Sequence, residues 1–174
     1  MPNNPALFIS TTVLYNKTMI ENSDYRGYYA DCYVLSNNRT AGFIYEFLDK
    51  FLPEREESAD EYLVPMYSDN PERVYNKASE LIEFLCKNPT CSNTIYWANS
   101  SLPELKGAMC FFTDDGNIIL GLYCNTKYEN TEIEDRILAS MKEFVGSDVG
   151  LITYEEPAPH NSTKFRHMIK ERST

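Results

Sequence analysis

The chain contains few of the side chains from which metal sites and nucleophilic active sites are built. Its two histidines, His160 and His167, lie seven residues apart near the end of the sequence, whereas zinc sites draw on His and Cys at short spacings. A Ser–His or Cys–His pair would have to use one of these two histidines, and no nucleophile elbow is present. We therefore expect both histidines to be solvated, and we expect no metal, no cofactor and no enzymatic activity.

Carboxylates are abundant, and their number alone explains the adjacent pairs. With 26 acids against 16 bases, pairs such as Asp114-Asp115 and Glu155-Glu156 do not identify a catalytic acid and base. The segment 114–117 also lacks the twelve-residue spacing and closing Glu of a common calcium loop. The dipeptide Asp115-Gly116 instead predicts the tight turn of a β-hairpin.

The negative charge is concentrated in the body of the chain. Residues 1–163 hold 12 bases and 25 acids, while the last 11 residues hold four bases and one acid. Such a body repels nucleic-acid backbones and anionic membranes and attracts a basic partner. Five of the eight residues from 54 to 61 are acids, which predicts a solvated loop that either serves solubility or docks a basic protein.

An aromatic pair, Tyr96-Trp97, is the second candidate contact. Trp97 either fills the core or anchors a partner, because aromatic side chains serve in both places. The predicted partner-binding residues are therefore one tryptophan and the five acids of the loop: Glu54, Glu56, Glu57, Asp60, Glu61 and Trp97.

The segment 106–125 predicts the hairpin around which the fold is organised. Two apolar runs flank Asp115-Gly116, and in each run both alternating sets of side chains are apolar. Both faces of this hairpin should therefore be covered by other parts of the protein.

Other elements follow from residue type and period. Strands are predicted at 6–15, 28–35, 94–99 and 149–154, with a short segment at 62–67 that Pro65 restricts to an edge. Helices are predicted at 40–52, at 70–88 after the start signal Asp69-Asn70-Pro71, and at 131–145. Thr131 and Glu134 have capping-box spacing, and Gly146 suits a C-terminal cap. A short basic helix is expected at 162–172.

The order β-β-α-β-α-β-β-β-α-β indicates an α+β fold. We expect a mostly antiparallel central sheet with three main helices packed on it. Residues 1–159 should form a single domain, and residues 160–174 a basic C-terminal tail or short helix.

The cysteines and the N-terminus bear on the compartment. The five cysteines include no Cys-x-x-Cys pair and lie mainly in apolar runs, so they are expected to be buried thiols in a reducing environment. The sequence lacks both a signal-peptide pattern and a membrane-spanning apolar run. A cytoplasmic location is therefore expected.

Two segments resemble immunity proteins of bacterial polymorphic toxin systems. They are Tyr-Trp-x-Asn at 96–99 and Phe-Phe-Thr-Asp-Asp-Gly-x-Ile-Ile-Leu-Gly-Leu at 111–122. The match covers about residues 94–124, and the rest of the chain fits in size and charge. Members of this family bind a cognate toxin and block it, often by covering its active site. The resemblance implies a protein that neutralises a toxin. The negative charge of residues 1–163 indicates that this toxin is basic, with a nuclease as the candidate.

Two other functions remain open. A sheet that is apolar on both faces would also suit a structural or adaptor domain that acts as a homodimer. A small-molecule-binding protein, or an enzyme of another kind, would require a polar cavity with converging side chains.

Overall fold

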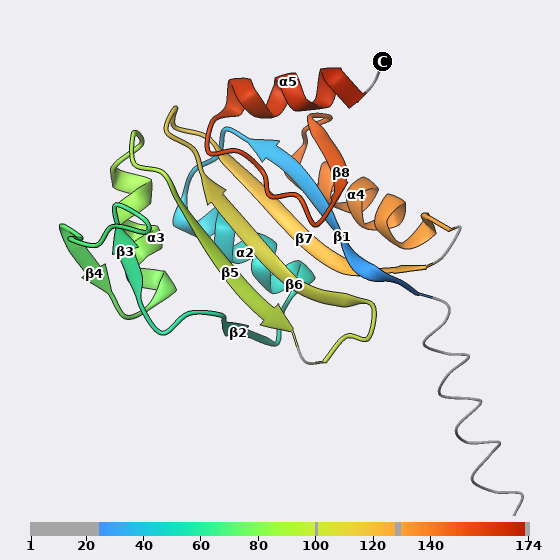
Figure 1. Ribbon diagram of the computed structural model, residues 1–174, viewed down its shortest axis with the longest axis horizontal. Coiled ribbons are helices and arrows are strands. Elements are labelled where there is room, and N and C mark those ends of the chain that lie inside the picture. Colours follow the sequence, from blue (N-terminus) through green and yellow to red (C-terminus); the bar gives the residue numbers. More distant parts are fainter. Residues whose placement is uncertain (1–24, 100, 128–129, 173–174) are drawn as a thin grey trace, which may run out of the picture.

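The computed structural model describes residues 25–99, 101–127 and 130–172 (Figure 1). The predicted strand 6–15 lies outside these residues. The main sheet has six strands in the order β2-β5-β6-β7-β1-β8, and every neighbouring pair is antiparallel. Its strands are β1 (Tyr25–Ser36), β2 (Arg55–Glu57), β5 (Asn93–Asn99), β6 (Leu105–Phe112), β7 (Ile118–Lys127) and β8 (Gly150–Tyr154). The predicted α+β class with a mostly antiparallel sheet is confirmed.

Four helices and a small second sheet complete the described fold. The helices are α2 (Ala41–Phe51), α3 (Ala78–Lys87), α4 (Glu132–Val145) and α5 (Ser162–Arg172). The second sheet pairs β3 (Tyr62–Val64) with β4 (Arg73–Tyr75). Among the described residues, no helix combines the length and apolar character needed to span a bilayer.

The β6–β7 hairpin lies in the middle of the main sheet, and both faces of its half nearest the turn are covered. On one face, Cys110, Phe112 and Leu120 belong to a core that includes buried residues of α2, α3 and α4. On the other face, Phe111 and Ile119 belong to a smaller core around Phe165 of α5. The turn lies at the predicted Asp115-Gly116, and Gly116 has the left-handed φ of 85° that suits glycine. The connection is longer than a two-residue tight turn, because five residues separate β6 from β7. A single chain therefore supplies the cover that this hairpin needs.

Helix α5 forms over the predicted residues and packs against the sheet. Phe165 is completely buried, and Met168 and Ile169 pack beside it. The hairpin turn holds the start of this helix, because the Asp115 carboxylate accepts hydrogen bonds from the Ser162 N–H at 3.0 Å and hydroxyl at 2.6 Å.

The expectation that His160 is solvated is wrong. Its imidazole is half-buried beside the Phe111 ring, and its Nε2 lies 2.5 Å from the Thr94 hydroxyl oxygen. Burial lowers the pKa of His160. The cause is the docking of α5, which draws the preceding residues onto the sheet. The side chain of His167, by contrast, is largely exposed.

The predicted helix start at Asp69-Asn70-Pro71 is also wrong. These residues precede strand β4, and α3 begins only at Ala78. Its N-cap, Lys77, makes no side-chain capping bond. Instead, the Glu57 carboxylate accepts the Ala78 N–H at 2.7 Å. The group that stabilises this helix end comes from a strand, so a local capping pattern could not locate it.

Two smaller corrections concern the acidic segment and α4. Residues 55–57 form the edge strand β2 on β5, so the segment 54–61 is not loop throughout. Charged side chains suit such an edge because they discourage pairing with another chain. At α4, the Thr131 hydroxyl donates to Asp135 at 2.7 Å and makes no capping bond to the backbone. Gly146 does form the expected left-handed C-terminal cap.

Arg39 joins three separate parts of the fold. This side chain is buried, and its guanidinium lies 5.0 Å from the centre of the Phe112 ring. It donates hydrogen bonds at 2.6–3.3 Å to the six backbone carbonyls of Leu85, Asn88, Pro89, Cys91, Thr113 and Asn117. One guanidinium thus provides hydrogen-bond donors for backbone carbonyls at the end of α3, in the loop after it and in the β6–β7 turn.

Replacing Arg39 with Met should lower the free energy of unfolding by about 3 kcal/mol or more, because buried carbonyls lose their donor. Arg39→Lys should recover only part of this loss, since an ammonium has three donors and no planar fork. Urea denaturation measures both effects. Arg166→Met, at an exposed position on α5, is the control and should change stability by less than about 0.5 kcal/mol. A similarly small effect at Arg39 would contradict this account.

Candidate functional site

The sheet face that carries α5 is covered at one end and open at the other. The open end forms a depression of about 430 Å³, called here the tyrosine cleft. It is lined by four tyrosines, two carboxylates, a methionine and a proline: Tyr29, Tyr33, Tyr96, Tyr123, Asp31, Glu155, Met109 and Pro157. Its side chains come from four neighbouring strands and from the turn that follows β8.

Antiparallel pairing brings these residues together in two adjacent rows. In the first row, Tyr96 is paired with Met109, Met109 with Gly121, and Gly121 with Tyr33. In the second row, Tyr123 lies between Gly107 and Asp31. Directly paired residues of an antiparallel sheet point to the same face. The rows therefore present their tyrosines and Asp31 on one continuous surface.

Two glycines make room for the tyrosine rings. A Cβ added to Gly121 would come within 2.9 Å of the Tyr33 ring, and one added to Gly107 would clash with the Tyr123 side chain. Because neither glycine has a side chain, each ring can lie across the strand beside its own. The floor of the cleft is therefore fixed by the backbone as well as by packing.

The tyrosines differ in exposure. Tyr33 is buried, and its hydroxyl lies 3.4 Å from the Glu156 carbonyl oxygen, to which it donates. Burial raises the pKa of Tyr33, so this hydroxyl stays protonated. Tyr96 and Tyr29 are 37% and 44% exposed, and the Tyr29 ring meets Tyr123 edge-on at 5.8 Å. The cleft thus has a buried floor and accessible aromatic walls.

Asp31 is a carboxylate held in a desolvated position. The residue is only 8% exposed. Burial and, to a smaller extent, the negative charge of Glu155 raise its pKa to about 6, and hydrogen bonds from the Glu156 and Glu155 backbone oppose this rise. Among the side chains that the structure describes, which begin at residue 29, no lysine, arginine or histidine forms a salt bridge with Asp31 or Glu155. These side chains therefore leave the negative charge of the cleft without a basic partner.

The predicted partner-binding residues lie beside this cleft or under the sheet. Glu54, Glu56, Asp60 and Glu61 are exposed on β2 and in the loops on either side of it. This group is called here the acidic edge. Glu57 is different, because its carboxylate accepts hydrogen bonds from the Tyr62 hydroxyl at 3.0 Å and from the Ala78 N–H at the start of α3. Glu57 therefore has a structural role.

The prediction of Trp97 as a surface anchor is wrong. Trp97 is 3% exposed and belongs to the core under α2 and α3. Successive strand residues face opposite sides, so burying Trp97 turns its neighbour Tyr96 toward the cleft. The alternative that Trp97 fills the core is thus confirmed. Sequence reasoning overlooked the alternation Tyr29-x-Asp31-x-Tyr33, which places three polar or aromatic side chains on one face of β1.

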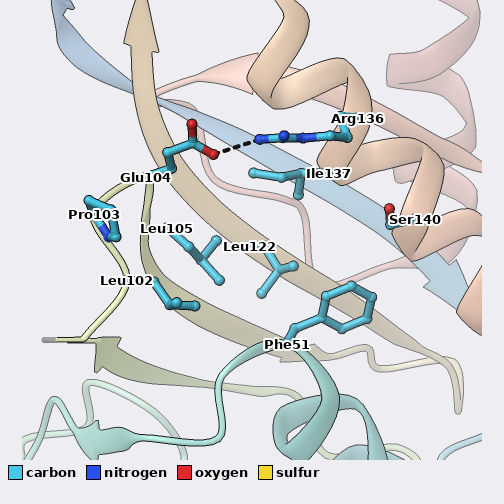
Figure 2. A pocket seen from close by; sticks show the side chains of 9 residues that line it. All are labelled: Phe51, Leu102, Pro103, Glu104, Leu105, Leu122, Arg136, Ile137 and Ser140. Atoms are coloured by element: carbon cyan, nitrogen blue, oxygen red, sulfur yellow. Dashed lines mark hydrogen bonds and ion pairs between the residues drawn. The ribbon is translucent and has the colours of Figure 1, made fainter.

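A second hollow, of about 340 Å³, lies on the helix side of the sheet (Figure 2). Its walls are mainly apolar and include Phe51, Leu105, Leu122 and Ile137. At its rim, Arg136 on α4 donates to the Glu104 carboxylate at 2.6 Å. This ion pair pairs the two charges at the rim, and the remaining lining is apolar except for Ser140.

No cluster of three or more His, Cys, Asp or Glu side chains suited to a metal ion occurs among the described residues. Comparisons with protein families, curated proteins and solved structures found no match to this chain. The tyrosine cleft is thus interpreted from its own geometry. It offers aromatic surface, protonated hydroxyls and an uncompensated carboxylate, which are groups for recognition.

The desolvation of Asp31 can be tested through the pH dependence of stability. Because its folded pKa of about 6 lies above the ordinary 3.8, the folded state loses stability as pH rises through this interval. Asp31→Asn should therefore stabilise the protein more, relative to wild type, at about pH 7.5 than at about pH 4. We expect a difference of roughly 1–2 kcal/mol after allowance for solvent screening.

Urea denaturation at the two pH values isolates this effect, because hydrogen bonds lost by the amide are lost at both. Asp148→Asn, an exposed acid beyond α4, is the control and should show no such pH difference. An equal effect of Asp31→Asn at both pH values would show that this carboxylate is not desolvated.

Proposed function

We propose that this protein is a non-enzymatic immunity protein that binds a basic cognate toxin directly and neutralises it. The toxin is expected to be a nuclease, whose substrate-binding surface must itself be basic. The observation that carries this proposal is the tyrosine cleft, an open aromatic surface with uncompensated negative charge. The resemblance of residues 94–124 to immunity proteins and the excess of 13 acids over bases in residues 1–163 support it.

The cleft and the acidic edge are neighbours on the molecule. β2 pairs with β5, and the Ser58 N–H donates to the Tyr96 carbonyl at 3.0 Å. A hollow of about 300 Å³ also links them, since both Tyr96 and Glu61 line it. The two features therefore suit a single contact surface, with tyrosines at its centre and carboxylates at its rim.

This arrangement has the composition of a protein-binding surface. Tyrosine is enriched at interfaces because it buries a large area while losing few rotatable bonds. Rim carboxylates mainly raise the rate of encounter with a basic partner and reject acidic ones. The same charge would repel nucleic acid and anionic membranes, so the proposed partner is a protein. The proposed compartment is the cytoplasm.

The homodimer alternative assumed that the two apolar faces of the sheet need cover from another subunit, and this assumption is not required. Met109, Phe111 and Ile119, which face the α5 side, are all buried within one chain. A one-to-one complex of toxin and immunity protein is therefore the proposed assembly.

Neutralisation can be tested by co-expression. The probe is the C-terminal domain of a secreted protein encoded directly upstream of this chain. That domain alone should stop the growth of a bacterial host, and co-expression of the full chain should restore growth. Size-exclusion chromatography with light scattering should then show a one-to-one complex. Growth arrest that persists despite folded, abundant chain would contradict the proposal.

The acidic edge can be tested in the same complex. Changing Glu54, Glu56, Asp60 and Glu61 together to Lys should slow association at low salt by roughly tenfold or more. The difference should shrink at high salt, which screens exposed charges. The control reverses four exposed acids on or beside α2 and α4, namely Glu46, Glu132, Glu143 and Asp148. If stopped-flow measurements gave equal rates for both variants, overall charge and not this edge would control encounter.

A further inference from the structure

We propose that the tyrosine cleft receives one cationic side chain of the partner, preferably arginine, with its guanidinium between the tyrosine rings and facing Asp31. This inference rests on the proposed function, because it names the group by which a basic protein would be recognised. It is argued from the side chains that line the cleft.

Asp31 has no counter-charge among the described side chains. Asp31 is only 8% exposed, and its carboxylate accepts hydrogen bonds from the backbone N–H groups of Glu155 and Glu156 in the turn after β8. Glu155 adds a second negative charge at the same wall. A desolvated carboxylate is stabilised most by a cation that also donates hydrogen bonds. Because the described bases do not supply that cation, the cleft is complementary to one that arrives with a partner.

The aromatic lining of the cleft also suits a cation. Tyr33, Tyr96 and Tyr123 come from three different strands and line the same depression as Asp31. The face of a tyrosine ring attracts a cation, and this attraction strengthens where water is excluded. A guanidinium stacks on such a ring and presents a fork of donors to a carboxylate at the same time, whereas an ammonium cannot stack. The combination therefore favours arginine over lysine.

The tyrosine rings of the cleft are held in place by the folded protein itself. Tyr33 is fixed by its hydrogen bond to Glu156, by an edge-on contact with Phe111 at 5.6 Å, and by its position over Gly121. Tyr123 lies over Gly107 in the same way. A site whose walls are already ordered loses little conformational entropy when it binds. This distinguishes the cleft from the acidic edge, whose side chains are exposed and free to move.

Binding should depend on the ionisation of Asp31. The titratable groups that face it are Glu155 from the turn after β8, Tyr33 from its own strand, Tyr123 from β7 and Tyr96 from β5. The tyrosines have raised pKa values and stay neutral near neutral pH. Affinity for a cation should therefore increase as pH rises through about 6, where Asp31 loses its proton.

The test uses the full chain and three probes, N-acetyl-arginine amide, its lysine counterpart and its uncharged citrulline counterpart. In an NMR titration, the arginine probe should shift the backbone amides of Asp31, Tyr33, Tyr96 and Tyr123. The dissociation constant should be on the order of 1–10 mM, as expected for a single side chain. Lysine should bind more weakly, and citrulline should leave these amides unchanged.

Variants at Asp31 and Tyr96 test the contribution of the carboxylate and of the aromatic ring separately. Asp31→Asn should weaken arginine binding by about tenfold or more and abolish its pH dependence. Tyr96→Ala should weaken it severalfold, whereas Tyr96→Phe should retain it because the ring remains. The control, Glu143→Gln on α4, should bind as wild type does. Equal binding of citrulline and arginine, or unchanged binding by Asp31→Asn, would overturn the proposal.

This outcome is separable from that of the co-expression test. If the chain restores growth but the cleft does not bind arginine, neutralisation is supported and the inference about the cleft is wrong. If arginine binds at the cleft but growth is not rescued, the chemistry of the cleft stands and neutralisation fails. Binding of the free probe with micromolar affinity would contradict a subsite for one side chain and would indicate a small cationic ligand instead.

Discussion

The described fold depends on one buried cation that is neutralised without an acid. Arg39 precedes α2, yet its guanidinium binds carbonyls at the end of α3, in the loop after it, and in the β6–β7 turn. Carbonyls at a helix end carry partial negative charge, so this site stabilises a cation and satisfies backbone groups that would otherwise be unpaired. Burial lowers the pKa of Arg39, but an arginine remains charged. Fixing the β6–β7 turn in this way also fixes the place where α5 begins.

The position of α5 then decides which part of the sheet face is accessible. The turn carboxylate Asp115 holds Ser162, and Phe165 covers the row that contains Leu35, Phe111 and Ile119. Although desolvation acts in the opposite direction, hydrogen bonds from Ser162, Thr113 and Asn117 lower the pKa of Asp115 to about 2. The helix is therefore anchored by an ionised group at any ordinary pH. The rows beyond its reach form the tyrosine cleft, so the hairpin that organises the fold also delimits the candidate site.

Sequence reasoning succeeded where a signal was local. Asp115-Gly116 located the hairpin, and apolar periodicity located α2, α4 and α5. It failed where a partner came from elsewhere in the chain. The start of α3 depends on Glu57 of β2, and β2 itself is a strand of charged residues recognisable only by its pairing with β5. The cleft was missed for the same reason, because it requires β1 to lie beside β7, a neighbour distant in the sequence.

Strand β1 shows why the cleft is better explained by recognition than by folding. Between Leu35 and Tyr29, its face toward α5 changes from the core under α5 to the lining of the tyrosine cleft, where Asp31 is 8% exposed and Tyr29 is 44% exposed. Solvation alone would be met by threonine, which carries no charge to be desolvated. Instead the sheet places a carboxylate beside aromatic rings and uses two glycines to accommodate those rings. Departures from the arrangement that favours stability concentrate at functional sites, because binding repays their cost. Under the proposed function, the carboxylate at this position is therefore the strongest indication of where this protein would meet its partner.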